Sequence, residues 1–297
     1  MLTFFSTPKP FLGHVGLIQR NALQSWKRLH PGAEVILFGD DHGAADVCAE
    51  LHLRHEPRVH RNQYGTKYLA PIFDRAAELA RNDALCYVNC DIVLLDDFLP
   101  ALSSLLRTRR DFLMVGRRRD LDWREALPFD SPAWQSELRE LALRTGKLRP
   151  PQWMDYFAFS RQLYCGRIPP FVIGRPSWDN WLIWYARHSG ALVADASSAV
   201  MAVHQNHDYS YHPEGEAGVW QGAEAMQNLA LLQGGRCFAT VQDATHRLTA
   251  KGLRVNYPRY GVIARRRLRR ALDLLWFGFL DLTRPLRHPL GLRRHRS

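Results

Sequence analysis

Several kinds of segment are missing from this 297-residue sequence. It has no run of 18 apolar residues, so no segment is expected to cross a membrane as a helix. Its five cysteines include no C-x-x-C pair, which argues against a structural zinc site and fits buried thiols in a reducing compartment. No G-x-G-x-x-G or Walker motif follows an apolar segment, so a common dinucleotide-binding fold and a P-loop NTPase are poor fits. The first residues do not read as a signal peptide, and a cytoplasmic location is expected.

Acidic residues are scarce only near the C-terminus. The whole chain has a formal net charge of +11, and residues 251–297 contain 13 Lys/Arg but two acids, so the rest is balanced. We therefore expect one domain over residues 1–250 and a basic tail over 251–297. Apolar residues recur at helical spacing within 262–281, and basic residues surround them. This pattern favours a helix that binds an anionic membrane surface, and the cytoplasmic face of the membrane is the expected location. The alternative is a tail that packs on the domain; nucleic acid is not an expected partner, because no aromatic platform accompanies the charge.

The first hundred residues alternate apolar strands and amphipathic helices. The strands are continuous apolar runs rather than alternating ones, which is typical of a parallel sheet that is covered on both faces. The expected strands and helices are, in order, strand 2–5, helix 14–29, strand 34–41, helix 46–53, helix 66–82 and strand 84–95. This order predicts an α/β fold with a doubly wound, mostly parallel sheet, and ligands bind such sheets at the carboxyl ends of the strands.

The segment CYVNCDIVLLDDF, residues 86–98, places a carboxylate inside a very apolar run. A lone buried carboxylate costs several kcal/mol unless a charged group accompanies it. Asp91 therefore either caps a turn, meets an arginine, or binds a metal ion. Asp96 and Asp97 are expected to cap a helix that begins near Leu99, because acids are stabilised at helix N-termini.

The order of these motifs resembles that of the GT-A fold glycosyltransferases. The similarity rests on the β-α-β-α-β start, the acidic pair after the second strand, and the D-x-D variant Asn89-Cys90-Asp91 within YVNCDIV, and it covers roughly residues 1–210. Later residues fit the same order: Asp155-Tyr156-Phe157, then Trp178-Asp179-Asn180-Trp181, then His204. This resemblance implies a GT-A-like fold and transfer of a sugar from a nucleotide-diphosphate donor to a glycan or lipid-linked acceptor.

A divalent cation, Mn²⁺ or Mg²⁺, is the cofactor that the resemblance implies. Such an ion neutralises the diphosphate leaving group of a nucleotide-sugar. Asp91 is the expected ligand, with Asn89 contacting the donor ribose or reaching the metal through water. His204 is the expected second ligand and His207 the alternative, and an imidazole ligand suits Mn²⁺ better than Mg²⁺. A hydrogen-bonded histidine without a metal is the competing interpretation of His204.

Four further residues are expected to contact the donor. Asp40 and Asp41 end an apolar strand, and the resemblance implies that one of them binds the nucleoside, although aspartates are also common in turns of this type. Lys67, at the expected start of a helix, would meet a phosphate with help from the positive end of that helix. Thr7, after the first strand, would line the base.

Two carboxylates are candidates for the catalytic base. Asp179 lies at the start of a helix, so it either stabilises the helix dipole or deprotonates the acceptor hydroxyl, as the resemblance implies for inverting members. Asp155 is the alternative base or binds a sugar hydroxyl. Four aromatic residues are candidates for stacking on sugars, with at least two expected in the core instead: Trp153, Tyr156, Phe157 and Trp178.

Two other functions remain open from the sequence. The first is a nucleotidyltransferase that makes the activated sugar, although the loop STPKPFLGH lacks the Gly- and Arg-rich composition such enzymes usually have after the first strand. The second is a non-catalytic binding module that recruits partners through its basic tail.

Overall fold

The computed structural model describes residues 2–108, 110–208 and 213–258, and the single positions 261, 265, 268 and 272. One compact unit ends at Asn256, and a second begins at Tyr257. The amphipathic segment expected over residues 262–281 lies almost wholly outside the described residues, and the domain boundary expected after residue 250 stays a prediction. No helix in the described part of the chain combines the length and apolar character that crossing a bilayer requires.

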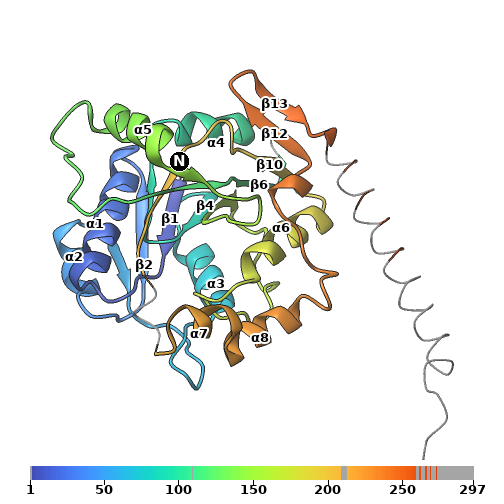
Figure 1. The fold of residues 1–297 in the computed structure, drawn as a ribbon, viewed down its shortest axis with the longest axis horizontal. Coiled ribbons are helices and arrows are strands. Elements are labelled where there is room, and N and C mark those ends of the chain that lie inside the picture. The colour runs from blue at the N-terminus through green and yellow to red at the C-terminus, as the bar shows by residue number, and fades with distance from the viewer. Residues whose placement is uncertain are drawn as a thin grey trace, which may run out of the picture. The chain divides into compact units, whose positions relative to one another are not determined.

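A large sheet of nine strands runs through the described part of the first unit (Figure 1), in the order β13-β12-β10-β6-β9-β4-β1-β2-β3. Most neighbours are parallel; β9 is antiparallel to both β4 and β6, and β13 is antiparallel to β12. Its strands are β1 (Leu2–Ser6), β2 (Glu34–Phe38), β3 (Arg54–Glu56), β4 (Ala84–Val88), β6 (Phe112–Val115), β9 (Tyr156–Ser160), β10 (Leu192–Asp195), β12 (His246–Thr249) and β13 (Gly252–Val255).

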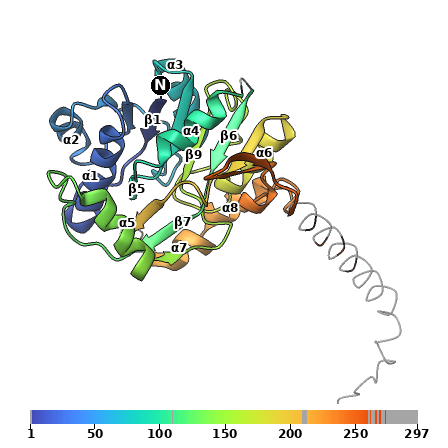
Figure 2. The same ribbon diagram turned by 90° about the horizontal axis from the view of Figure 1, so that it is seen from above.

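A smaller sheet follows the order β5-β11-β7-β8. Its strands are β5 (Ile92–Leu94), β7 (Arg118–Leu121), β8 (Lys147–Leu148) and β11 (Ala202–Gln205). Strand β11 is antiparallel to β5 and parallel to β7. Figure 2 shows β5 and β7 beside the layer that contains β1, β9 and β6.

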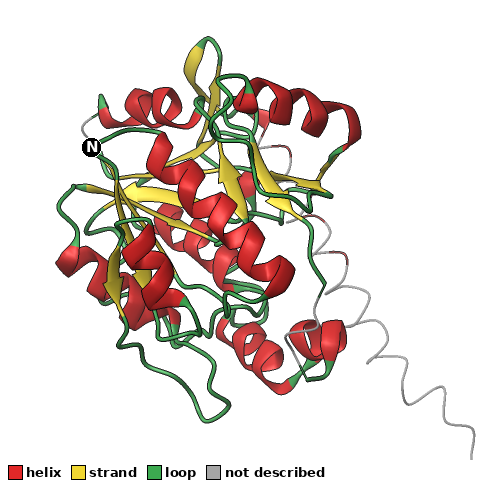
Figure 3. Cartoon of the chain, turned by 90° about the vertical axis from the view of Figure 1, so that its left-hand side faces the viewer, coloured by secondary structure: helices red, strands yellow, loops and turns green. Residues whose placement is uncertain are grey.

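Helices cover both faces of the large sheet (Figure 3). Successive residues of a strand point to opposite faces, and β1 shows the result. Phe4 stacks on Trp26 with ring centroids 5.9 Å apart, whereas Phe5 contacts Phe73 edge-on at 5.0 Å. The helices are α1 (Gly13–Arg28), α2 (Ala44–Glu50), α3 (Leu69–Leu79), α4 (Phe98–Leu106), α5 (Trp134–Thr145), α6 (Trp178–His188), α7 (Gly215–Gln221) and α8 (Ala223–Leu231), with a 3-10 turn at Val241–Asp243. The prediction of a doubly wound, mostly parallel α/β fold is confirmed.

The segment expected to be one strand over residues 84–95 is two strands. β4 belongs to the large sheet and β5 to the small one, and residues 89–91 link them. Both halves are fully buried, which explains why they look alike in sequence. The link therefore lies where the two sheets meet, with Asp91 at its end.

The expectation that Asp96 and Asp97 cap a helix is wrong in its mechanism. Helix α4 begins at Phe98 after Asp97, but no side chain caps it. Asp97 and Asp96 instead accept hydrogen bonds from the two terminal nitrogens of Arg139, at 2.7 and 2.8 Å. The ion pair connects α4 to α5 across 42 residues of sequence, which a local capping rule does not anticipate.

Candidate functional site

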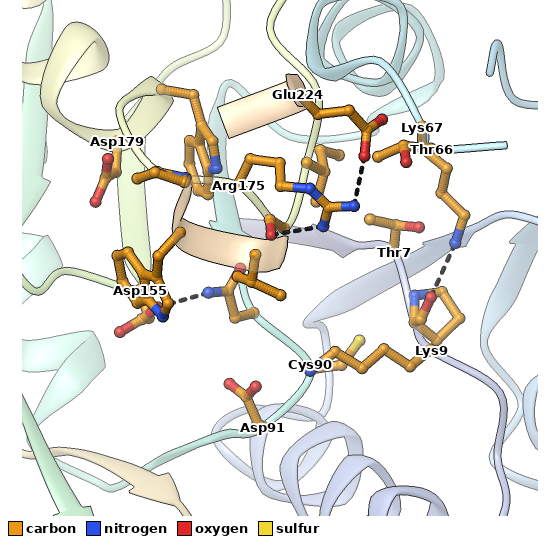
Figure 4. Close-up of a pocket in the computed structure, with 18 of the residues that line it drawn as sticks. Thr7, Lys9, Thr66, Lys67, Cys90, Asp91, Asp155, Arg175, Asp179 and Glu224 are labelled. Atoms are coloured by element: carbon orange, nitrogen blue, oxygen red, sulfur yellow. Dashed lines mark hydrogen bonds and ion pairs between the residues drawn. The ribbon is translucent and has the colours of Figure 1, made fainter. Parts of the chain in front are cut away.

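A cleft of about 1310 Å³ opens where the parallel strands of the large sheet end (Figure 4). Thr7 lines it just after β1, Asp41 after β2 and Asn89 directly after β4. Asp155, which precedes the antiparallel strand β9, lies at the same edge. The expectation that polar side chains gather at one edge of the sheet therefore matches the arrangement in the structure.

Asp91 lies beside two histidines in this cleft. Strand pairing brings them together, because Ile92 is the partner of His204 in the register of β5 and β11, and the amide of Gln205 donates to the carbonyl of Asp91. Asp91 Oδ2 is 3.2 Å from Nε2 of His207 and 3.9 Å from Nε2 of His204. One ligand atom from each of the three residues lies within 4.8 Å of the others.

The outer nitrogens of the two histidines face oxygen atoms. Nδ1 of His204 is 3.3 Å from Oδ1 of Asp120, its neighbour across strands β11 and β7, and Nδ1 of His207 is 2.7 Å from the carbonyl oxygen of Asp208. The carbonyl acceptor at Nδ1 of His207 favours the tautomer that leaves Nε2 as a lone-pair ligand, the arrangement usual for metal-binding histidines, whereas Nδ1 of His204 lies near Asp120 without a hydrogen bond in the described structure.

Asp91 also has a buried oxygen that needs a partner. Among the described residues, nothing donates a hydrogen bond to Oδ1 of Asp91. A buried carboxylate oxygen without a donor is costly unless a cation lies near it. Two Nε2 atoms and a carboxylate form a ligand set that Mn²⁺ accepts readily. Asp91, His204 and His207 therefore fit a divalent cation.

Lys9 adds a further positive group to this part of the cleft. Its Nζ is 3.2 Å from Nε2 of His207, and the side chain of Gln19 holds the backbone of Lys9 through two hydrogen bonds of 2.7 and 2.9 Å. Burial lowers the pKa of Lys9, although the charge of Asp91 opposes this. Burial would raise the pKa of Asp91, but the two imidazoles and Lys9 outweigh it and hold that pKa well below its usual range.

A chain of hydrogen bonds and ion pairs connects Asn89 with Asp120, which lies beside Nδ1 of His204. The Nδ2 of Asn89 donates to Oδ1 of Asp155 at 2.6 Å, and the other oxygen of Asp155 accepts from Arg118 at 2.7 Å. Arg118 also donates through Nε to Asp120 at 2.9 Å, and nearby carboxylates hold its pKa above the usual range despite burial. Both oxygens of Asp155 are thus occupied, and the amide of Asn89 is committed to Asp155.

Lys67 and Asp41, two of the residues expected to contact the donor, line the cleft and form an ion pair with each other. Lys67 donates to Asp41 and, at 2.8 Å, to the carbonyl oxygen of Pro8. Asp40 accepts from Arg61 at 2.6 Å, and this hydrogen bond lowers the pKa of Asp40. Asp41 lines the cleft, whereas the side chain of Asp40 is 68% exposed. Lys67 precedes α3 by two residues rather than starting it, so its phosphate-binding role stays a prediction.

Thr7 lines the cleft with a buried hydroxyl that has no hydrogen-bond partner among the described residues. It follows β1 directly, in the same loop as Lys9. A buried hydroxyl is costly when it is left unpaired, and a bound polar ligand in the cleft would satisfy it. Its expected contact with the base of a donor stays a prediction.

Asp179 lies in the cleft wall near the start of α6 (Figure 4). Burial, reinforced by the charge of Asp155, raises its pKa to about 7. Ser177, the residue before α6, has φ 92°, a strained conformation for a residue with a Cβ, and its side chain does not cap the helix. The amide of Asn180 donates to Asp179 at 2.9 Å and fixes its side chain.

The aromatic candidates divide as expected between core and cleft. Tyr156, Phe157 and Trp178 are buried, although Trp178 also lines the cleft. Trp153 is partly exposed, and its ring centroid is 5.2 Å from that of Trp220, which arrives from α7. The guanidinium groups of Arg149 and Arg118 lie 4.0 and 5.0 Å from the Trp153 ring.

Four residues of this site are not singled out by the sequence as functional. The position of Lys9 in the sequence could have predicted its place in the site, since a lysine in the loop after the first strand lies at the ligand-binding edge of the sheet. Arg118 and Asp120 belong to the run RRRD, in which alternate residues of a strand share one face. No sequence pattern indicates Trp220, because its place in the cleft depends on how helix α7 packs.

No family model matches the sequence, and no curated protein matches it. Among solved structures, glucosyl-3-phosphoglycerate synthase from Mycobacterium tuberculosis with Mn²⁺, UDP-glucose and phosphoglyceric acid is 17% identical. The match has a TM-score of 0.47 and covers 80% of this chain and 79% of that one. The same synthase with Mg²⁺ and UDP gives a TM-score of 0.45, also at 17% identity and covering 80% and 79%. S. aureus TarS 1–349 is 10% identical with a TM-score of 0.41, covering 69% of this chain and 58% of that one.

Proposed function

We propose that this chain is a metal-dependent glycosyltransferase, which moves a sugar from a nucleotide-diphosphate donor to an acceptor hydroxyl. The observation that supports this most directly is the grouping of Asp91, His204 and His207 within 4.8 Å, in a cleft where parallel strands end. Ligand sites in open α/β sheets occur at that edge. The D-x-D-like position of Asp91 directly after a buried strand adds the sequence resemblance to the geometry.

The cation is Mn²⁺ or Mg²⁺, held by Asp91, His204 and His207. When bound, it neutralises the negative charge that grows on the diphosphate as the glycosidic bond breaks. Lys9 lies close to the position of the diphosphate in this proposal, because its Nζ is 3.2 Å from Nε2 of His207, one of the proposed metal ligands. We assign Lys9 to the donor phosphates, with Thr7 and Asp41 toward the nucleoside.

Asp179 is the general base in this proposal. A base works best when its pKa lies near the operating pH, and a value of about 7 meets that condition. Asp155 is the weaker candidate, since Asn89 and Arg118 already occupy both of its oxygens. Asp155 instead positions Asn89, the first residue of the N-C-D motif.

The acceptor is a glycan or a lipid-linked sugar. Trp153 and Trp220 form an aromatic wall in the same cleft as Asp179, and sugars present apolar faces that pack on such rings. Arg149 and Arg118 stack on Trp153 and fix its orientation. Residues 262–281 are proposed to bind an anionic membrane surface, where lipid-linked acceptors occur.

The test is nucleotide binding followed by transfer. Full-length protein is heated with UDP, GDP, CDP or dTDP, each with and without Mn²⁺, and one nucleotide is expected to raise the melting temperature only when Mn²⁺ is present. A ligand at 100 times its Kd stabilises by about 2.7 kcal/mol, which is a shift of several degrees. Asp91→Asn should abolish the Mn²⁺-dependent part. Asp96→Asn is the matched control, because Asp96 lies beyond the other end of β5 but is 71% exposed and lies outside the cleft.

The outcome also separates the alternatives. Sugar transfer to a glycan or lipid-linked acceptor with release of the nucleoside diphosphate supports the proposal. Release of pyrophosphate from a nucleoside triphosphate and a sugar phosphate would identify a nucleotidyltransferase instead. Mn²⁺-dependent donor binding without transfer or donor hydrolysis would favour a non-catalytic module, and no response to any nucleoside diphosphate would contradict the glycosyltransferase proposal.

A further inference from the structure

A second hollow lies behind the strand that supports the cleft. Arg118 and Asp120 of β7 belong to the ion-pair chain of the cleft, whereas Arg117 and Arg119, their neighbours in the run RRRD, line a separate cavity of about 380 Å³. Successive residues of a strand point to opposite faces, which accounts for this division. We call this cavity the basic groove; it is lined by Asp97, Arg117, Arg119, Arg139, Leu143, Leu148 and residues 197–202.

Arg117 and Arg119 are held in place but not neutralised. Nε of Arg117 donates to the carbonyl oxygen of Arg149, and a terminal nitrogen of Arg119 donates to that of Gly146 at 2.9 Å. Neither guanidinium forms an ion pair with a carboxylate among the described residues. A guanidinium has five N–H donors, so most donors of both groups remain available to a ligand. Both side chains are only partly exposed.

The acids near the groove accept hydrogen bonds, although Oδ1 of Asp97 is buried without a partner among the described residues. Asp97 accepts from Arg139 at 2.7 Å and from the amide of Met201 at 3.1 Å, and Asp96 accepts from the same arginine. Asp195, which lies behind the groove, accepts from the amide and the hydroxyl of Ser197. Arg139 is thus paired with two carboxylates, whereas neither Arg117 nor Arg119 forms an ion pair with a carboxylate in the described part of the chain.

Apolar side chains form the rest of the groove. Leu143 at the end of α5 is 59% exposed and Leu148 of β8 is 39% exposed, and both line the cavity. Val200 and Ala202 are buried and also line it. The surface thus combines two anchored cations with an exposed apolar rim.

We propose that the basic groove binds a phosphate group on a molecule that also has an apolar portion. Arginine forks match phosphate oxygens in pairs, and two forks at one hollow hold a single phosphate from two sides. The exposed leucines then contact the apolar portion. The phosphate comes either from a soluble phosphate ester or from a lipid headgroup. This site is separate from the cleft, so the proposal stands independently of the glycosyltransferase assignment.

Hydrogen exchange measured by mass spectrometry on the full-length chain tests the proposal. Three probes are compared: glycerol 3-phosphate, phosphatidylglycerol vesicles and phosphatidylcholine vesicles. We expect slower exchange at residues 197–202 with glycerol 3-phosphate, with phosphatidylglycerol, or with both, and no change with phosphatidylcholine. Response to the soluble ester identifies a soluble ligand, and response to phosphatidylglycerol alone identifies a lipid.

The variant Arg117→Gln/Arg119→Gln should weaken the phosphate-dependent protection at least about tenfold, because charge-assisted hydrogen bonds are lost. Arg117→Lys/Arg119→Lys keeps the charge and should recover part of the affinity, which also shows that the groove still folds. Arg144→Gln is the matched control, since Arg144 is exposed on the same helix as Leu143 but does not line the groove. Equal protection by phosphatidylcholine, equal loss in the control, or no protection by any probe would overturn the proposal.

Discussion

Replacing Asp179 by Asn tests two ideas about this carboxyl. The first is that it is the general base, and the second is that its burial lowers the stability of the folded protein. Burial raises its pKa to about 7, so the folded protein keeps a proton there that the unfolded chain releases near pH 4. Above pH 7 the folded chain must hold a partly buried negative charge. The destabilising contribution of Asp179 to the free energy of unfolding grows between pH 4 and 7 and reaches its full size above pH 7. It disappears as the pH falls, because the folded state then binds more protons than the unfolded state.

The expected magnitude follows from the shift. A pKa raised by about three units corresponds to about 4 kcal/mol, which is an upper limit because the side chain has some access to solvent. We expect Asp179→Asn to stabilise the protein by about 1–2 kcal/mol at pH 8. For a chain of this size the melting temperature rises by roughly 2–6 °C. The gain should shrink to a few tenths of a kcal/mol near pH 4 and vanish below about pH 3, where the wild-type carboxyl is neutral in both states.

The assay pairs unfolding with kinetics. Melting temperatures of wild type and variant are compared from pH 4 to 9, and kcat/KM for sugar transfer is measured over the same range. Wild-type kcat/KM should rise with pH through about 7, and loss of the base should lower the rate by roughly 10²–10⁴. Asp46→Asn is the control, since Asp46 also lies in the first turn of a helix, α2, but is exposed. A variant that keeps the wild-type rate and pH profile, or shows no pH-dependent gain in stability, would refute the reasoning.

Three further predictions concern the ion-pair chain and the histidines. His207→Ala should weaken Mn²⁺ binding by at least about tenfold, measured by electron paramagnetic resonance of the free ion; unchanged affinity would remove His207 from the ligand set. Asp120→Asn keeps all three proposed ligands but should still weaken Mn²⁺ binding by about tenfold or more, because His204 loses its neighbouring carboxylate. Arg118→Met should lower the free energy of unfolding in urea by about 3–5 kcal/mol, since Asp155 and Asp120 lose their shared cation; a change below 1 kcal/mol would contradict this.

The sequence predicts the first half of the fold well, because its strands are buried on both faces and its helices have one apolar face. The expected helices and strands up to residue 82 all exist, with ends that differ by a few residues. The prediction fails over residues 84–95, since apolar composition is the same on both sides of Asn89-Cys90-Asp91. The break arises from pairing of β5 with β11, more than 100 residues later in the chain. A local pattern contains no information on that partner.

The site could be predicted in its location more readily than in its contacts. Strand ends mark the ligand edge of a parallel sheet, and the polar residues after β1, β2 and β4 were found by that rule. The ion pairs of the site join charged side chains that are far apart in the sequence. Lys67 donates to Asp41, and Asp97 binds Arg139 rather than capping α4. Residue types at single positions do not distinguish these partners.

The link between β4 and β5 explains why the chain tolerates a carboxylate at position 91. Each of its three residues is fixed by a different part of the fold. The amide of Asn89 donates to the carbonyl of Asp155, Cys90 Sγ contacts Ser6 Oγ at 3.1 Å, and the carbonyl of Asp91 accepts from Gln205. The large sheet therefore sets one end of the link and the small sheet sets the other. A ligand group that is held from both sides loses little freedom on binding an ion, which is the condition for a preorganised metal site. On this reasoning, the geometry of the site depends on how the two sheets meet, and substitutions in the β5–β11 pairing should weaken Mn²⁺ binding even when all three ligands are intact.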